Sequence, residues 1–135
     1  MSTLRKYIIV DDDPTNNMIC SIMLEMVLGE VDVKTFEFPE EGLAFIQNEY
    51  IKTLEPTVLF LDINMPTLTG WEFMEQYEKF SKEIKKQISV YILSSSVDGR
   101  DRDKAETHKH IKGFISKPLD KETILSIAGK KVDIG

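Results

Sequence analysis

The sequence has few of the residues that mark cross-linked or membrane-bound proteins. Its single cysteine, Cys20, excludes a disulfide within the chain and a cysteine-rich zinc site. No apolar run is long enough to cross a bilayer, and the N-terminus lacks the long apolar stretch of a signal peptide. We therefore expect a soluble, cytoplasmic protein in a reducing compartment, with no membrane partner.

Positive charge is also scarce. Lys and Arg total 17 against 23 Asp and Glu, so the net charge at neutral pH is −6. Nucleic-acid binding needs a positive surface that displaces counterions, so we expect no nucleic-acid partner. The 135 residues, 41% of them hydrophobic, have the size and composition of one globular domain. We place this domain at residues 5–129, followed by a short tail at 130–135.

Short apolar runs alternate with longer amphipathic segments along the chain. The runs predict strands near Tyr7–Val10, Val31–Phe36, Val58–Leu61, Val90–Leu93 and Gly113–Ser116. The intervening segments predict helices that begin near Pro14, Pro39, Trp71, Gly99 and Asp120. Strands separated by helices pair in parallel and need helices on both faces of the sheet. The pattern predicts an α/β fold with a doubly wound parallel sheet.

The first predicted helix is rich in apolar residues. Met18, Ile22 and Met26 recur at every fourth position. Ile19, Met23 and Val27 form an adjoining row of the same helix. We expect this wide stripe, with its methionines, to pack in the core rather than to form a groove for a partner.

Chemically active residues follow the strands at their carboxyl ends, where ligands bind in doubly wound sheets. They are Asp11, Asp12 and Asp13 after the first strand, Asp62 after the third, Ser94 after the fourth and Lys117 after the fifth. Carboxylates packed together repel one another unless a cation is present. Oxygen ligands at this charge density predict Mg²⁺.

Asp62 is the most informative of these residues. It ends a buried apolar run, and a buried carboxylate is costly unless it is paired or bound to a metal. Lys117 precedes Pro118, whose peptide bond can be cis and aim the lysine at the sheet edge. The set predicts phosphoryl transfer to a carboxylate, with Asp62 as nucleophile and with Lys117 and Ser94 binding the phosphoryl oxygens.

Four segments match a known family in order and spacing. They are Ile8–Pro14, Leu59–Pro66, Ile92–Ser95 and Phe114–Pro118. Across about residues 5–129 the chain resembles the response-regulator receiver domain of two-component signalling, in the manner of single-domain chemotaxis receivers. The resemblance implies a flavodoxin-like, five-stranded parallel sheet of order 2-1-3-4-5.

The resemblance also implies roles for the acidic residues. Asp62 would be the phosphoacceptor and a metal ligand. Asp12 would bind Mg²⁺ directly, and Asp11 would act mainly through water. Asn64 would contribute its main-chain carbonyl to the metal.

Three further positions take roles from the resemblance. Lys117 would pair with Asp62 and later with the phosphoryl group. Ser94 stands at the position of a switch hydroxyl, with Ser95 as the alternative because the interval to Lys117 is long. Phe114 stands where the family has a Tyr or Phe whose ring turns inward on activation.

The implied function is a stand-alone receiver, whose output is protein contact or phosphorelay shuttling. A histidine kinase or histidine phosphotransfer protein would phosphorylate Asp62 and so switch a surface that binds a downstream protein. The chain would be monomeric or would dimerise on phosphorylation. It would not be an enzyme beyond self-phosphorylation from small donors and autodephosphorylation.

Other interpretations remain at this stage. The chain could be a receiver-like binding module that phosphorylation does not regulate, or a receiver cut from a longer hybrid kinase. It could also be an aspartate-based phosphohydrolase that uses Asp11 and Asp13, with Thr15 completing the pattern. That class needs a further acidic pair after a later strand, and it leaves Asp62 without a role.

Overall fold

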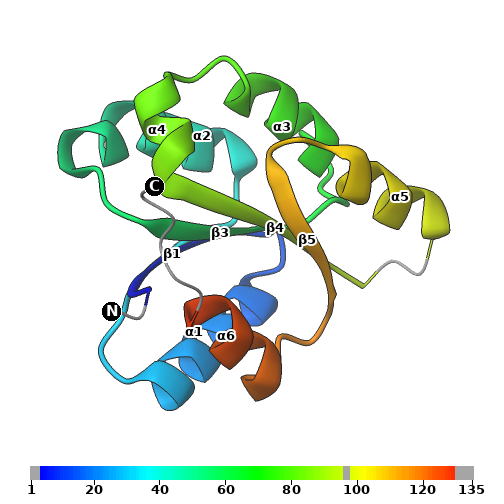
Figure 1. The fold of residues 1–135 in the computed structure, drawn as a ribbon. Coiled ribbons are helices and arrows are strands. Elements are labelled where there is room, and N and C mark those ends of the chain that lie inside the picture. Colours follow the sequence, from blue (N-terminus) through cyan, green and yellow to red (C-terminus); the bar gives the residue numbers. More distant parts are fainter. Residues whose placement is uncertain (1–3, 96–97, 130–135) are drawn as a thin grey trace.

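The computed structural model describes residues 4–95 and 98–129 (Figure 1). The elements in chain order are β1 (Lys6–Val10), α1 (Pro14–Leu28), β2 (Asp32–Phe36), α2 (Pro39–Asn48), a 3₁₀ helix (Tyr50–Thr53), β3 (Thr57–Leu61), α3 (Gly70–Tyr77), α4 (Lys82–Gln87), β4 (Ile88–Ser94), α5 (Gly99–Thr107), β5 (Ile111–Ser116) and α6 (Lys121–Ala128). The tail at 130–135 lies outside the described residues.

The sheet has the predicted architecture. Its strands lie in the order β2-β1-β3-β4-β5, and every neighbouring pair is parallel. Helices α1 and α6 cover one face, and α2, α3 and α4 cover the other (Figure 1). The α/β, doubly wound, flavodoxin-like fold is therefore confirmed.

Two apolar clusters form the core, one on each face of the sheet. Ile8 and Val10 of β1 point into the cluster beneath α2, α3, α4 and α5. Tyr7 and Ile9 point into the cluster beneath α1 and α6. Strands β1 and β3 are buried along their whole length because helices cover both of their faces.

Local signals in the sequence begin and end these helices. Pro14 starts α1 after Asp13, whose side chain accepts a hydrogen bond from the Thr15 amide. Gly29 ends α1 with a φ of 83°, a conformation that favours glycine. The side chain of Asp120 caps α6. The Lys117–Pro118 peptide bond is cis.

The expected burial of the apolar stripe on α1 is wrong for most of its members. The helix packs through Asn17, Cys20 and Leu24, while Met18 is 58% exposed and Met26 is 75% exposed. Apolar residues occupy more than one side of this helix, so the pattern alone does not select the side that faces the sheet.

Two other differences concern helices. Helix α4 was not predicted, because its six residues are too few for a periodic apolar pattern. Helix α5 ends at Thr107, although the polar segment that predicts it continues to His110. Within the described part of the chain, no helix is both long and apolar enough to cross a membrane.

Candidate functional site

The carboxyl ends of strands β1, β3, β4 and β5 lie at the same edge of the sheet. Main-chain hydrogen bonds continue past the strands: the Asp62 amide donates to the Val10 carbonyl at 2.9 Å. The Lys117 amide donates to the Ser94 carbonyl, also at 2.9 Å. These bonds fix the residues that follow each strand, and so they bring the predicted side chains to one place.

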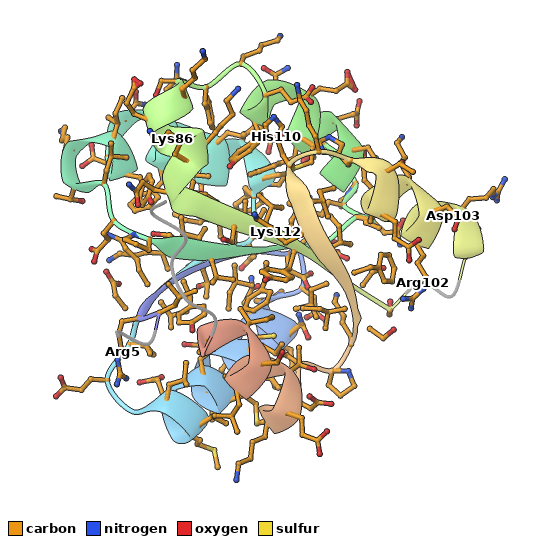
Figure 2. All side chains as sticks on the ribbon, viewed as in Figure 1. Arg5, Lys86, Arg102, Asp103, His110 and Lys112 are labelled. Carbon is orange, nitrogen blue, oxygen red and sulfur yellow. The ribbon has the colours of Figure 1, made fainter. Side chains whose placement is uncertain are left out.

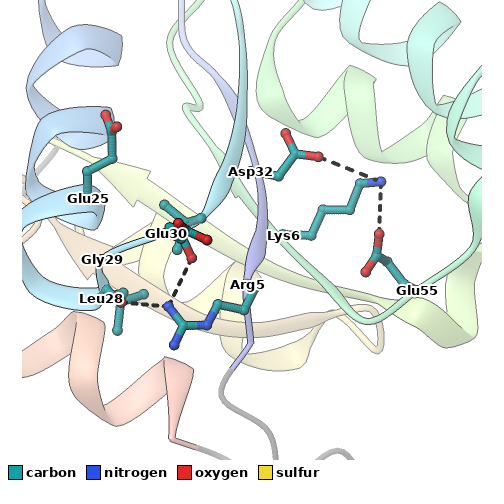
Figure 3. Close-up of a pocket in the computed structure, with 9 residues that line it drawn as sticks. Arg5, Lys6, Glu25, Leu28, Gly29, Glu30, Asp32 and Glu55 are labelled. Carbon is teal, nitrogen blue, oxygen red and sulfur yellow. Dashed lines mark hydrogen bonds and ion pairs between the residues drawn. The ribbon is translucent and has the colours of Figure 1, made fainter.

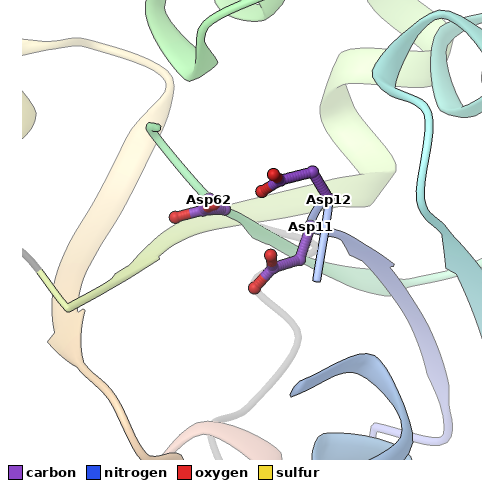
Figure 4. A group of neighbouring side chains, drawn as sticks. All are labelled: Asp11, Asp12 and Asp62. Carbon is purple, nitrogen blue, oxygen red and sulfur yellow. The ribbon is translucent and has the colours of Figure 1, made fainter. Parts of the chain in front are cut away.

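Three carboxylates lie together at this edge (Figure 4). One oxygen from each of Asp11, Asp12 and Asp62 lies within 4.8 Å of the other two. Asp11 and Asp62 are buried, and Asp12 is more exposed. Among residues 4–95 and 98–129, no other group of three His, Cys, Asp or Glu side chains is arranged in this way.

Lys117 reaches into the carboxylate group. Its Nζ lies 2.7 Å from Asp11 Oδ2 and 3.6 Å from Asp62 Oδ1. Burial opposes the charge on this lysine, but the hydrogen bond to Asp11 and the charge of Asp62 outweigh it and raise the lysine pKa. Lys117 is therefore held as a cation against two buried carboxylates.

One ammonium group does not balance three carboxylates. Burial, with the negative charge of Asp11 as the next cause, raises the pKa of Asp62 to about 6 from its usual 3.8, although Lys117 acts in the opposite direction. A divalent cation would offset this repulsion. The donor set consists of carboxylate oxygens alone, which fits Mg²⁺ and disfavours metals that prefer sulfur or imidazole.

Hydrogen bonds from the start of α1 and from its N-cap residue orient Asp11. Its Oδ2 accepts from Asn16 Nδ2 at 2.7 Å, and its Oδ1 accepts from the Asp13 amide at 2.9 Å. Asn17 Nδ2 donates to the Asp11 carbonyl at 2.9 Å. Sequence reasoning missed both asparagines. Their signal was two consecutive amides at the start of an otherwise apolar helix.

The loop after Asp62 packs tightly against the start of α3. The Gly70 amide donates to the Ile63 carbonyl at 2.8 Å. A Cβ atom at Gly70 would lie 2.6 Å from the Asp62 carbonyl oxygen and 2.8 Å from Ile63 Cα. Glycine is therefore required here, a role that its position in the sequence did not reveal. Asn64 lies in the same loop with an exposed side chain.

Ser94 and Ser95 differ in their surroundings. Ser94 ends β4, is fully buried and pairs in register with Ser116. Ser95 follows it and is exposed. The burial of Ser94 at the edge where Lys117 is held favours it as the predicted hydroxyl.

Phe114 lies on β5, two residues before the end of the strand. It pairs in register with Ile92 and packs, half-buried, against the core. The guanidinium of Arg102, on α5, lies 4.8 Å from the centre of the Phe114 ring. Figure 2 shows Arg102 extending from α5 toward β5, the strand that carries Phe114. The aromatic ring thus packs between the core and a charged side chain.

Asp13 does not join the carboxylate group. Its Oδ1 accepts from the Thr15 amide at 3.0 Å, and its side chain is exposed. The geometry therefore gives Asp13 the role of a helix cap. It does not support a phosphohydrolase site built from Asp11 and Asp13.

A wide hollow of about 1170 Å³ lies at the opposite end of the sheet (Figure 3). Both cations that line it have partners. Arg5 donates to the carbonyls of Leu28 and Glu30, and Lys6 pairs with Asp32 and Glu55. The hollow lies at the end of the sheet away from Asp11, Asp12 and Asp62, and none of these carboxylates lines it.

Comparison with known proteins decides the family. The sequence model of the response regulator receiver domain matches residues 7–128. The chain belongs to the response regulator receiver family. This assignment places it in two-component or chemotaxis-type signalling.

Curated relatives include whole receivers and longer proteins. The chain is 29% identical to protein PilH of Pseudomonas aeruginosa over 122 residues, which are 90% of this chain and 93% of PilH. It is 36% identical over 76 residues to a protein-glutamate methylesterase/protein-glutamine glutaminase of Agrobacterium fabrum. That match covers 56% of this chain and only 20% of the Agrobacterium protein, so it concerns the receiver part.

Solved structures give the same fold. A response regulator receiver protein from Dyadobacter fermentans superposes with a TM-score of 0.80 at 26% identity, covering 90% of this chain and 96% of that one. A two-component response regulator from Cytophaga hutchinsonii gives a TM-score of 0.86 at 24% identity, covering 94% and 96%. The residues expected from the family resemblance thus lie on a receiver fold.

Proposed function

We propose that this receiver accepts a phosphoryl group on Asp62 from a histidine kinase or a histidine phosphotransfer protein. The single observation that carries the proposal is the convergence of Lys117 with three carboxylates at the carboxyl edge of the sheet. The chain would act in the cytoplasm as a monomer or as a phosphorylation-dependent dimer. Its output would be an altered surface for a downstream protein.

Mg²⁺ would be held by the side chains of Asp11, Asp12 and Asp62 and by the main-chain carbonyl of Asn64. When bound, the ion supplies positive charge that neutralises the carboxylates and the transferring phosphoryl group. The oxygen-only donor set and the raised pKa of Asp62, which follows from burial and the charge of Asp11, support this ligand set.

The transfer forms a bond between a carboxylate oxygen of Asp62 and phosphorus. The bond from phosphorus to the donor nitrogen breaks, and its electron pair stays on the donor imidazole. Lys117 shifts from the Asp62 oxygen to a phosphoryl oxygen, where its charge is again balanced. The side-chain amide of Asn16 and the main-chain N–H of Asp13 keep Asp11 in place during this change.

The signal would then spread along β4 and β5. The Ser94 hydroxyl would donate to a phosphoryl oxygen, and Phe114 would turn inward as the β4 end moves. Its half-buried position and its contact with Arg102 support a ring that has two packing arrangements. The protein would catalyse no turnover beyond self-phosphorylation from small donors and autodephosphorylation.

The test uses acetyl phosphate and Mg²⁺, with the intact mass as the measurement. The native protein should gain the mass of one phosphoryl group, and removal of Mg²⁺ by a chelator should prevent this. Asp62→Asn should gain nothing. Asp13→Asn is the matched control, since Asn also caps a helix and the residue lies outside the carboxylate group.

Two results would count against the proposal. One is no adduct on the native protein, which would favour a receiver-like module that phosphorylation does not regulate. The other is an equal adduct on Asp62→Asn, which would place the phosphoryl group elsewhere.

A further inference from the structure

A groove lies between α1 and the edge strand β2, on the side of the molecule away from β5. It has a volume of about 620 Å³ and continues along the loop that joins β2 to α2. No part of the carboxylate group lines it. The groove is therefore a separate feature of the surface.

Large apolar side chains line this groove and are exposed to solvent. Met18 is 58% exposed, Ile22 is 47% exposed and Phe38 is 54% exposed. They are exposed because α1 turns its Cys20–Leu24 row to the sheet and Phe38 stands before the first turn of α2. Adjacent exposed apolar side chains of this size mark a binding surface more often than an ordinary solvated face.

Charge around the groove has one sign. The charged residues that line it are Glu25, Glu37 and Glu41, and within the described ranges no Lys, Arg or His lines it. Three carboxylates beside an apolar floor favour a ligand that combines apolar groups with positive charge. They oppose an anionic membrane surface, which would be repelled.

The groove also contains an unmet hydrogen-bond acceptor. Asn17 lines the groove and is 4% exposed. Its Nδ2 donates to the Asp11 carbonyl, but its Oδ1 is buried without a partner among the described residues. A buried acceptor without a donor is unfavourable. An N–H group of a ligand that opens the groove slightly would satisfy it.

We propose that this groove binds an amphipathic segment of a partner protein in which apolar side chains are flanked by Lys or Arg. The apolar groups would cover Met18, Ile22 and Phe38, and the cations would lie against the glutamates. A second copy of this chain is a poorer occupant, because a two-fold interface would bring like-charged glutamates together. The site is distinct from the phosphoacceptor and extends the proposed function.

The probe is a capped amphipathic peptide of leucine and lysine, added to isotope-labelled full-length protein. Amide shifts in the NMR spectrum should concentrate in α1 and in residues 33–41. The double variant Glu37→Lys, Glu41→Lys should weaken binding by about tenfold. Phe38→Ser should also weaken it, and serine is a favourable residue before α2, so the fold should persist.

Matched controls separate this site from general charge attraction. Glu75→Lys with Glu106→Lys makes the same change in net charge at exposed positions of α3 and α5 and should leave binding within about twofold. A leucine–glutamate peptide should not bind. Equal weakening by the control pair, equal binding of the acidic peptide, or shifts centred on another face would overturn the proposal.

The alternative occupants give distinct results. Sedimentation of the native protein should show no dimer that Phe38→Ser removes, since such a dimer would assign the groove to a second copy. Vesicles containing phosphatidylserine should not retain the protein, since retention that depends on Phe38 would assign the groove to a membrane.

Discussion

The carboxyl edge of the sheet is built differently on its two sides. At the ends of β1 and β3, main-chain hydrogen bonds hold the buried carboxylates, and the Lys117 cation reaches them from the end of β5. Beside β4 and β5, helix α5 buries only Ala105. The first side is suited to hold reacting groups, and the second is suited to move, because few buried contacts oppose its opening.

Side-chain contacts at the surface attach α5 to its neighbours. Trp71 Nε1 donates to Asp101 at 3.3 Å, and Lys104 Nζ lies 4.7 Å from the centre of the Trp71 ring. Arg102 lies over Phe114. Each of the two cation–π contacts is worth about 0.5–1 kcal/mol at an exposed site. The comparison therefore predicts large changes in stability from substitutions around the buried carboxylates. It predicts small changes from substitutions on α5.

Lys117→Gln should have the largest effect. It leaves Asp11 and Asp62 buried without their cation, and loss of one partner from such a pair should cost about 2–4 kcal/mol at neutral pH. Urea unfolding without Mg²⁺ measures this cost. Lys112→Gln, an exposed change on β5, the strand that precedes Lys117, is the control and should stay near the native value. Equal stabilities of the two variants would contradict a lysine that balances the buried carboxylates.

Asp62→Asn should stabilise the protein when Mg²⁺ is absent. Burial and the charge of Asp11 raise the pKa of Asp62 to about 6, so the folded state binds the proton more tightly than the unfolded state. Native stability should thus fall as pH rises from about 4 to about 6. The variant should be about 2–3 kcal/mol more stable at neutral pH, since each pKa unit corresponds to about 1.4 kcal/mol.

Urea unfolding across this pH range tests the sign. The native curve should decline toward neutral pH, and the part of the decline that is due to Asp62 should be absent from the variant. A native stability that rises over the same interval, with no gain from the substitution, would mean that Asp62 is stabilised in its charged form.

Gly70→Ala should cost about 1–3 kcal/mol, because the added Cβ meets main-chain atoms of Asp62 and Ile63 that cannot turn away. It should also slow phosphorylation by acetyl phosphate, since the Asp62 loop must shift. Gly99→Ala, at the start of α5, is a matched control because a Cβ there has no atom within 4 Å. Unchanged stability of Gly70→Ala would show that the loop is loosely packed.

Arg102→Ala should have the smallest effect, at about 0.5–1 kcal/mol. The readout that matters is local: hydrogen exchange in α5 should speed up while exchange in β1 and β3 stays the same. Asp103→Ala, an exposed change on the same helix, should leave exchange in α5 near native. Faster exchange throughout the sheet would indicate that both sides of the edge unfold as one unit.

The sequence predicts well which charged residues meet at the site. Parallel strands place their carboxyl ends at one edge, so apolar runs ending at Asp11, Asp62 and Lys117 imply that these side chains meet. The magnesium ligands and the switch residues stay predictions, since they concern states that involve a metal or a phosphoryl group. The helix caps at Asp13 and Asp120 are also readable from local sequence.

The remaining features depend on distances between segments. The requirement for Gly70 arises from one close approach to the Asp62 loop, and the roles of Asn16 and Asn17 arise from their contacts with Asp11. The exposed Met18 side of α1 depends on which of several apolar rows faces the sheet. Periodicity does not specify these features, because segments with the same local pattern of apolar residues can make different tertiary contacts.

The central claim is that Asp11, Asp12 and Asp62 form one divalent-cation site beside Lys117. Its most direct test is the shift in urea midpoint that millimolar Mg²⁺ produces in the native protein, in Asp12→Asn and in Asp13→Asn. We predict a clear stabilisation of the native protein and of Asp13→Asn, with most of it lost in Asp12→Asn. No stabilisation of the native protein, or equal stabilisation of all three, would contradict the claim.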